Sequence, residues 1–372
     1  MQLDHRDAFH VPVGGPYLLT HSIGCLPRGT ESATIQDLLR PWRDLGGDAW
    51  PEWLTAIDRF CNALAALLGG RSSEYCPQPN VSAALTKLIA ALPRRDQTKR
   101  VWIAAEDTFP SLGYVLQKAQ RLGFELRLIP RTLDPADPKI WDAALTPDVF
   151  GALITHVHSN TGQVAPVKQI TRTCAERGIF SIIDIAQSAG ILPVSVDGFA
   201  ADAALGSCVK WLCGGPGAGF MWLRESLIPE LEPVDVGWFS HADPFEMDIH
   251  SFRYADTARR FWGGTPAIAP YIFATPGLQL LSEIGIGTVF AQNRELINAF
   301  FDSAPAGTRG RVDLETIGGT LCIPLGDQLG RVSESLRSIQ ARFDCRGSVL
   351  RLSFHLCNSV DEAILIGQAW PQ

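Results

Sequence analysis

The stretch "GALITHVHSNTGQVAPVKQITRTCAERGIFSIIDIA", residues 151–186, decides the fold of this chain. Its first seven residues have the composition of a strand. Residues 167–178 place apolar side chains at helical spacing and end on a glycine, and residues 179–186 are strand-like again. A strand, a helix and a second strand in this order predict two parallel strands joined by a crossover helix.

The same alternation extends to both sides of that stretch. "VWIAA" (101–105) and "ELRLIP" (125–130) are strand-like, and "SLGYVLQKAQRLG" (111–123) between them has helical spacing. "AALGSC" (203–208) is a further short strand. We therefore expect an α/β fold with a mostly parallel sheet covered by helices on both faces. The ligands of such sheets bind beyond the carboxyl ends of the strands.

The composition changes after about residue 256. The apolar stretch 271–301, the amphipathic segment 328–343 and the strand-like "VLRLSF" (349–354) alternate in a way that is typical of a smaller α+β domain. A length of 372 residues is also long for a single core, so two domains are expected.

Composition excludes several classes of partner. Hydrophobic residues make up 46% of the chain and charged residues 19%, which indicates a soluble globular protein with a large interior. The net charge of -7 contains no basic run, so nucleic acid is not expected as a partner. No signal peptide and no long apolar run is visible, which predicts a cytoplasmic protein without a membrane partner. The nine cysteines lack zinc-ligand spacing, so we expect reduced thiols and no metal.

Two charged residues follow the predicted strands. Asp184 ends an apolar strand, where a carboxylate needs a cationic partner. Lys210 comes after one further short strand, within "GSCVKWLCGGPGAG" (206–219), at a spacing that could bring it to the same edge of the sheet. An ordinary ion pair and a nucleophilic lysine are both consistent with these two residues alone.

Two more features point to a cofactor. Phe109 follows the strand at 101–105, where its ring could stack on a flat ligand or simply fill the core. Asn80, Val81 and Ser82 open a helix whose free amides could cap it or hold an anion. A Schiff-base lysine, a carboxylate, an aromatic ring and an anion site together are the set that pyridoxal 5'-phosphate (PLP) requires.

Residues 155–223 resemble the class V aminotransferase superfamily of fold-type I PLP-dependent enzymes, and within it the kynureninases most closely. Further motifs that resemble the family are "YLLTHSIGCLP" (17–27), "VGWFSH" (236–241), "FWGGTPAI" (261–268) and "LRLSFHLCNS" (350–359). The resemblance implies a homodimer with shared active sites. It also implies an N-terminal segment (1–40) that contributes to the active site, a large PLP-binding domain (41–255) and a small domain (256–372).

The resemblance implies a role for each matching residue. Lys210 would form the Schiff base, Asp184 would hold the pyridine nitrogen protonated, and Phe109 would stack on the ring. Gln187 would bond the phenolic oxygen, as in cysteine desulfurases, whereas kynureninases carry histidine there. The other implied positions are Asn80, Val81, Ser82 and Ser207 for the phosphate, Trp238 and Thr265 for a dimer-shared wall, Arg351 for the substrate carboxylate, and Ser22, Asn160 and His158 for the substrate.

Three departures bear on the reaction. Kynureninases carry tyrosine where this chain has Val209, and an acid where it has Leu112. The mobile loop of cysteine desulfurases is replaced by a short segment in which Cys345 is the only thiol. We therefore expect a lyase that cleaves a C–S or C–C bond at the β or γ carbon of an α-amino acid. Kynureninase-like hydrolysis, class V transamination and a non-catalytic scaffold are the alternatives.

Two loop histidines complete the predicted site. His158 and His241 are expected to face the cofactor, where either could stack or move a proton. Cys208 and Cys213 flank the lysine and are expected to be small core residues.

Overall fold

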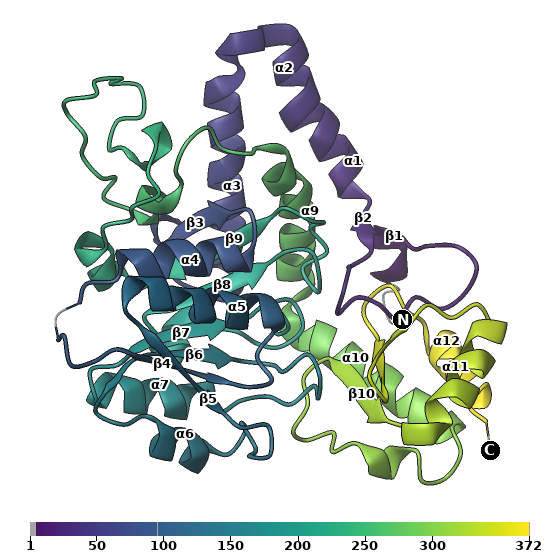
Figure 1. Cartoon of the computed structure of the whole chain (residues 1–372). Coiled ribbons are helices and arrows are strands. Elements are labelled where there is room, and N and C mark those ends of the chain that lie inside the picture. The colour runs from purple at the N-terminus through teal and green to yellow at the C-terminus, as the bar shows by residue number, and fades with distance from the viewer. Residues whose placement is uncertain (1–4, 95, 372) are drawn as a thin grey trace.

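The computed structural model describes residues 5–94 and 96–371. Its largest element is a seven-stranded sheet in the order β3-β9-β8-β7-β6-β4-β5 (Figure 1). The strands are β3 (Tyr75–Gln78), β4 (Val101–Ala105), β5 (Glu125–Ile129), β6 (Val149–Thr155), β7 (Phe180–Asp184), β8 (Ala203–Ser207) and β9 (Gly219–Leu223). The five strands from β8 to β5 run parallel, while β9 and β3 pair antiparallel at one side. The predicted α/β fold with a mostly parallel sheet is therefore confirmed.

The register of the parallel strands fixes where their side chains meet. Thr155 at the end of β6 pairs with Asp184 at the end of β7, and Asp184 pairs in turn with Leu205 near the end of β8. The strands β4, β6 and β9 are buried along their whole length, as their apolar sequences predict. Polar residues that follow β6, β7 and β8 consequently lie at one edge of the sheet.

Helices pack on this sheet and connect its strands. α4 packs against β8 and β9, and α7 packs against β6 and β7. α7 ends before Gly178, whose φ of 61° suits a residue without a side chain. The helices of this part are α3 (Trp50–Leu68), α4 (Val81–Ala91), α5 (Pro110–Lys118), α6 (Pro138–Ala144), α7 (Val167–Glu176), α8 (Val196–Phe199) and α9 (Ala269–Ile284).

A second, smaller sheet has the order β10-β12-β11, with all pairs antiparallel. Its elements are β10 (Thr320–Pro324), β11 (Asp344–Arg346), β12 (Val349–Ser353), α10 (Ile286–Ser303), α11 (Leu329–Ser338) and α12 (Val360–Gln368). α9 packs against α3 in the core of the large sheet. The residues of α10 from Leu296 onward instead belong to a second hydrophobic core, that of the small sheet. We therefore propose a domain boundary inside α10, later than the predicted residue 256.

The N-terminal segment joins the two parts. Tyr17 and Leu19 form parallel bridges to Arg342 and Ser353 of the small part. The N–H of Gly24 donates to the carbonyl of Val209, next to the predicted catalytic lysine, at 2.8 Å. The remaining elements are β1 (Phe9–His10), β2 (Leu26–Pro27), α1 (Gly29–Ala33), a π-helical segment (Thr34–Leu39) and α2 (Arg40–Leu45).

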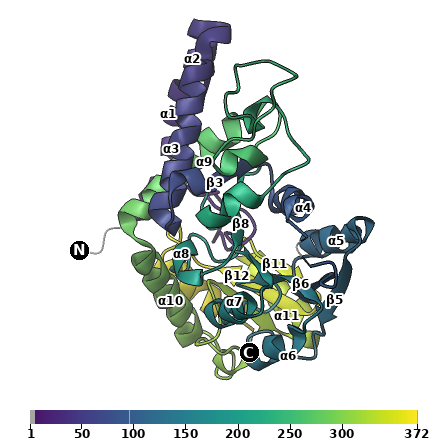
Figure 2. The same cartoon turned by 90° about the vertical axis from the view of Figure 1, so that its left-hand side faces the viewer.

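Helices α1 and α2 and the start of α3 form an arm that projects from the molecule, with α2 at its far end in both views (Figures 1 and 2). Within the described ranges, no single helix is both long and apolar enough to cross a membrane. Among the helices that the structure describes, only α9 and α10 taken together reach that length and composition, and they are bent by 84°.

Candidate active site

A cavity of about 260 Å³ opens at the carboxyl ends of the parallel strands. Eight of the residues predicted for the cofactor line it: Asn80, Val81, Ser82, Phe109, Asp184, Gln187, Ser207 and Lys210. Leu112 and Val209, the two departures from kynureninases, also line it. So do Ser159, a candidate for the cofactor's edge, and Ser111, Thr155, Val157 and Ala186, which the sequence did not single out.

Asp184 lies at the floor of this cavity. It is the last residue of β7 and is only 7% exposed. The N–H of Ala186 donates to its Oδ1 at 3.0 Å. Burial raises the pKa of Asp184, while the nearby charge of Lys210 opposes that rise. A cationic group in the cavity would therefore be stabilised by this carboxylate.

Lys210 faces Asp184 from the turn after β8. Its Nζ lies 5.5 Å from the centre of the Phe109 ring. Burial lowers the pKa of Lys210, and the cations Arg351 and Arg346 lower it further, whereas Asp184 raises it. Among the described residues, none forms a hydrogen bond or ion pair with its Nζ. The amine is thus held in a setting that favours its neutral, nucleophilic form.

Small residues bring the backbone close to this lysine. A Cβ atom on Gly24 would lie 2.3 Å from the carbonyl oxygen of Lys210. One on Gly214 would lie 2.7 Å from the Cβ of Cys208. Glycine is therefore required at both positions for the turn to pack.

The part of the cavity lining at the start of α4 suits an anion. Asn80 caps α4, since its Oδ1 accepts from the N–H of Ala83 at 2.8 Å and from the Ser82 hydroxyl at 2.8 Å. Ser207 ends β8 beside it. A Cβ on Gly219 would come within 2.9 Å of the Cα of Asn80, so the strand approaches the helix N-terminus closely. A helix N-terminus with two hydroxyl groups is a favourable place for a phosphate.

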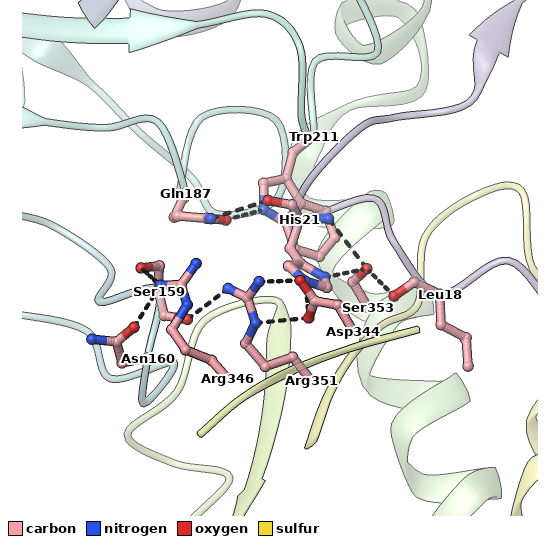
Figure 3. Close-up of polar contacts among 10 residues, drawn as sticks. All are labelled: Leu18, His21, Ser159, Asn160, Gln187, Trp211, Asp344, Arg346, Arg351 and Ser353. Carbon is pink, nitrogen blue, oxygen red and sulfur yellow. Dashed lines mark hydrogen bonds and ion pairs between the residues drawn. The ribbon is translucent and has the colours of Figure 1, made fainter. Parts of the chain in front are cut away.

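Gln187 is held in one orientation. Its Nε2 donates to the carbonyl of His21 at 3.0 Å, and its Oε1 accepts from Trp211 Nε1 at 3.1 Å (Figure 3). The amide therefore links the N-terminal segment to the residue that follows Lys210.

Arg351 comes from the central strand of the small sheet. Leu350 and Leu352 on either side of it point into the second core, which leaves Arg351 on the opposite face. Its side chain is nearly buried, so it is not an exposed arginine on an edge strand. Nε and Nη2 bind the carboxylate of Asp344, and Nη1 donates to the carbonyl of Ser159 at 3.0 Å (Figure 3).

His21 supports Asp344 from the other side. Its Nε2 lies 3.1 Å from Asp344 Oδ1, and its Nδ1 lies 2.9 Å from the Ser353 hydroxyl. Ser353 in turn donates to the carbonyl of Leu18 at 2.9 Å. Burial lowers the pKa of His21, although its bond to Asp344 opposes the effect. Burial alone would raise the pKa of Asp344. The hydrogen bonds from His21 and Arg351 outweigh this effect and lower the pKa to about 2.

Arg346 is a second guanidinium beside Ser159, and neither it nor Arg351 lines the cavity itself. It lies on β11, and its Nη1 donates to Ser159 Oγ at 2.9 Å and to Asn160 Oδ1 at 2.5 Å (Figure 3). Arg346 and Arg351 thus bind the same residue, Ser159, whose side chain lines the cavity.

Several predicted residues lie away from the cavity lining. Trp238 donates to the Thr265 hydroxyl at 3.3 Å, and this pair lies at the surface. The expectation that His241 faces the cofactor stays a prediction; within one chain its ring lies against the carbonyls of Asp243 and Ser251, away from the cavity lining. Ser22 is exposed and absent from the lining.

Two more predicted positions are buried or remote. The His158 ring is 1% exposed and has no hydrogen-bond partner within the described part of the chain. Like Asn160 and Arg351, it is absent from the lining of the single-chain cavity, and its part in substrate binding stays a prediction. Cys345 is exposed, and burial raises the pKa of Cys208 and Cys213.

Within residues 5–94 and 96–371, no group of three or more His, Cys, Asp or Glu side chains is arranged to hold a metal ion.

The cavity residues fit PLP. The capped N-terminus of α4 with Ser207 would hold the phosphate, and Phe109 would cover one face of the ring. Asp184 would contact the ring nitrogen, Gln187 the phenolic oxygen, and Lys210 the aldehyde carbon. This combination of fold and site defines the class of PLP-dependent enzymes.

The comparison with known families agrees. The family model "Aminotransferase class-V" matches residues 82–303, more than half of the chain. A kynureninase from Deinococcus radiodurans is 33% identical over 308 residues, which are 80% of this chain and 73% of that protein. A kynureninase from Burkholderia mallei is 30% identical over 312 residues, 79% of this chain and 72% of that protein. The chain belongs to the class-V aminotransferase family and is a PLP-dependent enzyme.

Solved structures share the fold. A cysteine desulfurase from Thermococcus onnurineus NA1 superposes with a TM-score of 0.83 at 19% identity, covering 99% of this chain and 96% of that chain. The cystine C–S lyase C-DES, in complex with its product cysteine persulfide, superposes with a TM-score of 0.82 at 19% identity, covering 95% and 96%. These likenesses confirm the predicted fold type.

Proposed function

We propose that this enzyme is a lyase that cleaves a C–S or C–C bond at the β or γ carbon of an α-amino acid. The observation that carries the proposal is that Leu112, Val157 and Val209, which line the same cavity as Lys210, are apolar. Hydrolysis of a ketone requires a positioned water and a proton donor, and these three side chains supply neither. Elimination of a β substituent requires the lysine to take the Cα proton and a proton to reach the leaving group, and the released enamine then reacts with bulk water to give a 2-oxo acid and ammonia, so no water positioned at this wall is needed.

PLP, when bound, supplies an electron sink for the negative charge that develops at the substrate Cα. Asp184 would keep the ring nitrogen charged, because a buried carboxylate is stabilised by a cation beside it. Lys210, whose pKa burial lowers, would take the proton from Cα as a neutral base. Leu112 and Val209 would exclude water from the reacting carbon.

Product analysis tests the proposal. The holoenzyme is incubated with a panel of single amino acids, and pyruvate, alanine, sulfide and 2-oxo acids are measured. We expect pyruvate or another 2-oxo acid together with the released substituent, formed catalytically. Formation of 2-oxo acid only when a second 2-oxo acid is added would identify a transaminase instead.

Kynureninase-like hydrolysis is the second candidate, since kynureninases are the relatives at 30–33% identity. Anthranilate release from kynurenine distinguishes the two reactions. Because Val209 and Leu112 offer no proton donor, we expect no anthranilate above background. Rapid release would reverse the order of the two candidates.

We further propose a homodimer with shared active sites. The pair Trp238 and Thr265 lies outside the single-chain cavity, at the surface. Large apolar side chains are exposed on the arm and on the neighbouring loop: Ile35, Leu39, Trp42, Phe245, Met247 and Ile249. Sedimentation of the holoenzyme tests whether it is a dimer. The cytoplasmic location of the protein stays a prediction.

A further inference from the structure

The side-chain amide of Gln187 has one orientation that satisfies both of its neighbours. The indole N–H of Trp211 can only donate a hydrogen bond, and its nitrogen lies 3.1 Å from Oε1 of Gln187. The carbonyl oxygen of His21 can only accept, and it lies 3.0 Å from Nε2 (Figure 3). A flipped amide would place donor against donor and acceptor against acceptor. The two contacts therefore determine which end of the amide is the nitrogen.

These contacts leave one N–H of Gln187 for a ligand. A glutamine amide carries two N–H groups on Nε2, and the carbonyl of His21 takes one of them. Within the described residues, this side chain forms no hydrogen bond besides those to His21 and Trp211. Gln187 lines the same cavity as Lys210 and Asp184. The amide can thus donate to an acceptor in the cavity from a nitrogen whose position is fixed.

Trp211 is itself held by close packing. Its side chain is fully buried, and the centre of its ring lies 5.7 Å from that of His355. A Cβ on Gly319 would lie 2.9 Å from the indole Cη2, and one on Gly190 would lie 2.8 Å from the carbonyl oxygen of Trp211. Gly319 directly precedes β10, and His355 follows β12. The residues beside the small sheet therefore confine the indole that orients Gln187.

We propose that Trp211 is a positioning residue for the cofactor: its indole N–H holds the Gln187 amide so that Nε2 donates to the phenolic oxygen of PLP. Without the indole N–H the amide is free to flip, and Oε1 then competes with Nε2 for the side that faces the cofactor. The inference extends the contact between Gln187 and the phenolic oxygen that the family resemblance predicts. It does not depend on which bond of the substrate the enzyme cleaves.

The proton on the Lys210 nitrogen reports on this contact. When PLP is bound to Lys210, that proton is shared between the lysine nitrogen and the phenolic oxygen. A donor to the oxygen stabilises its negative charge and so weakens its hold on the proton. The nitrogen therefore loses its proton at a lower pH with the donor than without it. Because this loss changes the visible absorption of the cofactor, the midpoint pH can be measured without any reaction.

The absorbance of the holoenzyme is titrated against pH for the wild type, Trp211→Phe, Gln187→Leu and the double variant. Trp141→Phe is the matched control, because its buried indole also donates to an uncharged oxygen, the carbonyl of Pro135 at 3.0 Å, away from the cavity lining. Placing β-(3-benzothienyl)alanine at position 211 keeps the shape of the ring and replaces the N–H by sulfur, which separates the hydrogen bond from packing. Cofactor absorbance and melting temperature show that each protein is folded and loaded.

We expect Trp211→Phe and the benzothienyl protein to raise the midpoint by about one pH unit, the size expected for losing a hydrogen bond to a charged group. Gln187→Leu should raise it at least as far. The double variant should match Gln187→Leu, because Trp211 acts only through this amide. Trp141→Phe should match the wild type.

An unchanged midpoint in the benzothienyl protein would overturn the inference, as would an unchanged midpoint in Gln187→Leu. A double variant whose shift is the sum of the two single shifts would show that Trp211 acts by another route. An equal shift in Trp141→Phe would show a general effect of losing a buried tryptophan, which also contradicts the inference. Product analysis with the amino-acid panel is scored separately, so a failure of the proposed lyase reaction leaves the role of Trp211 standing.

Discussion

Replacement of Asp344 by Asn probes how the two halves of the site are held together. The Asp344 carboxylate binds Arg351 with two bonds and also meets Nε2 of His21. These three residues come from the strands β11 and β12 and from the N-terminal segment. The substitution keeps the shape of the side chain and removes its charge, so the effect reports on electrostatics rather than on packing.

The magnitude follows from the pKa of Asp344. The ordinary value of 3.8 falls to about 2 in the folded protein, a difference worth about 2.4 kcal/mol at 1.36 kcal/mol for each pH unit. The side chain is 33% exposed, so screening by solvent reduces this to about 1–2 kcal/mol. Because the folded pKa is the lower one, this stability is present above pH 3.8 and is lost as the pH falls through 2.

Urea unfolding at pH 7 measures the effect. We expect the free energy of unfolding to fall by about 1–2 kcal/mol in Asp344→Asn. Asp302→Asn, in an exposed pair with Arg309, is the matched control and should lose under about 0.5 kcal/mol. Equal stability of wild type and Asp344→Asn would refute the reasoning, as would an equal loss in the control.

Three further predictions concern the lysine, the phosphate end and a buried histidine. Borohydride should fix a cofactor-derived mass on the Lys210 peptide of the wild type, and Lys210→Ala should show neither this mass nor turnover; a mass on another lysine would contradict the assignment. Gly219→Ala should weaken PLP binding by about tenfold, because its Cβ would lie 2.8 Å from the carbonyl of Gln78 and 2.9 Å from the Cα of Asn80. The affinity for PLP is measured by fluorescence titration, and equal affinities of the wild type and Gly219→Ala would disprove this prediction. Burial lowers the pKa of His355 from 6.5 to about 4, so the wild type should lose up to about 3 kcal/mol of stability as the pH falls from 6.5 to 4. His355→Phe should be less sensitive to pH over that range, and identical melting profiles would count against the argument.

Periodicity in the sequence was sufficient for the five parallel strands of the large sheet, whereas β3 and β9 were not predicted. The strands and helix of residues 151–186 fold within one local unit, so their pattern predicts their structure directly. Asp184 and Lys210 could be placed at one edge because parallel strands all end there. Asn80 was recognisable as a cap because that role depends on its immediate neighbours.

The carboxylate end of the site could not be derived in the same way. Asp344 and Arg346 lie on a three-residue strand that shows no periodic pattern. His21 reaches Asp344 only because a segment far away in the sequence pairs with β12. Such contacts depend on the register between distant strands, which a single sequence does not encode locally. The family resemblance predicted that Arg351 belongs to the active site, but it did not predict that Arg351 binds the carboxylate of Asp344.

The insertion of the N-terminal segment between the two parts has a consequence for biosynthesis. The carbonyl of Leu18 accepts the N–H of Ser353 at 3.1 Å, and the carbonyl of Pro16 accepts the N–H of Arg342 at 2.8 Å. On the ribosome, residues 16–24 emerge long before the strands that hold them, so they stay undocked while the large sheet folds. His21 and Gln187 therefore reach their final contacts only after β12 has been translated. A nascent chain that stops before residue 342 should take up PLP poorly, although its large sheet is complete.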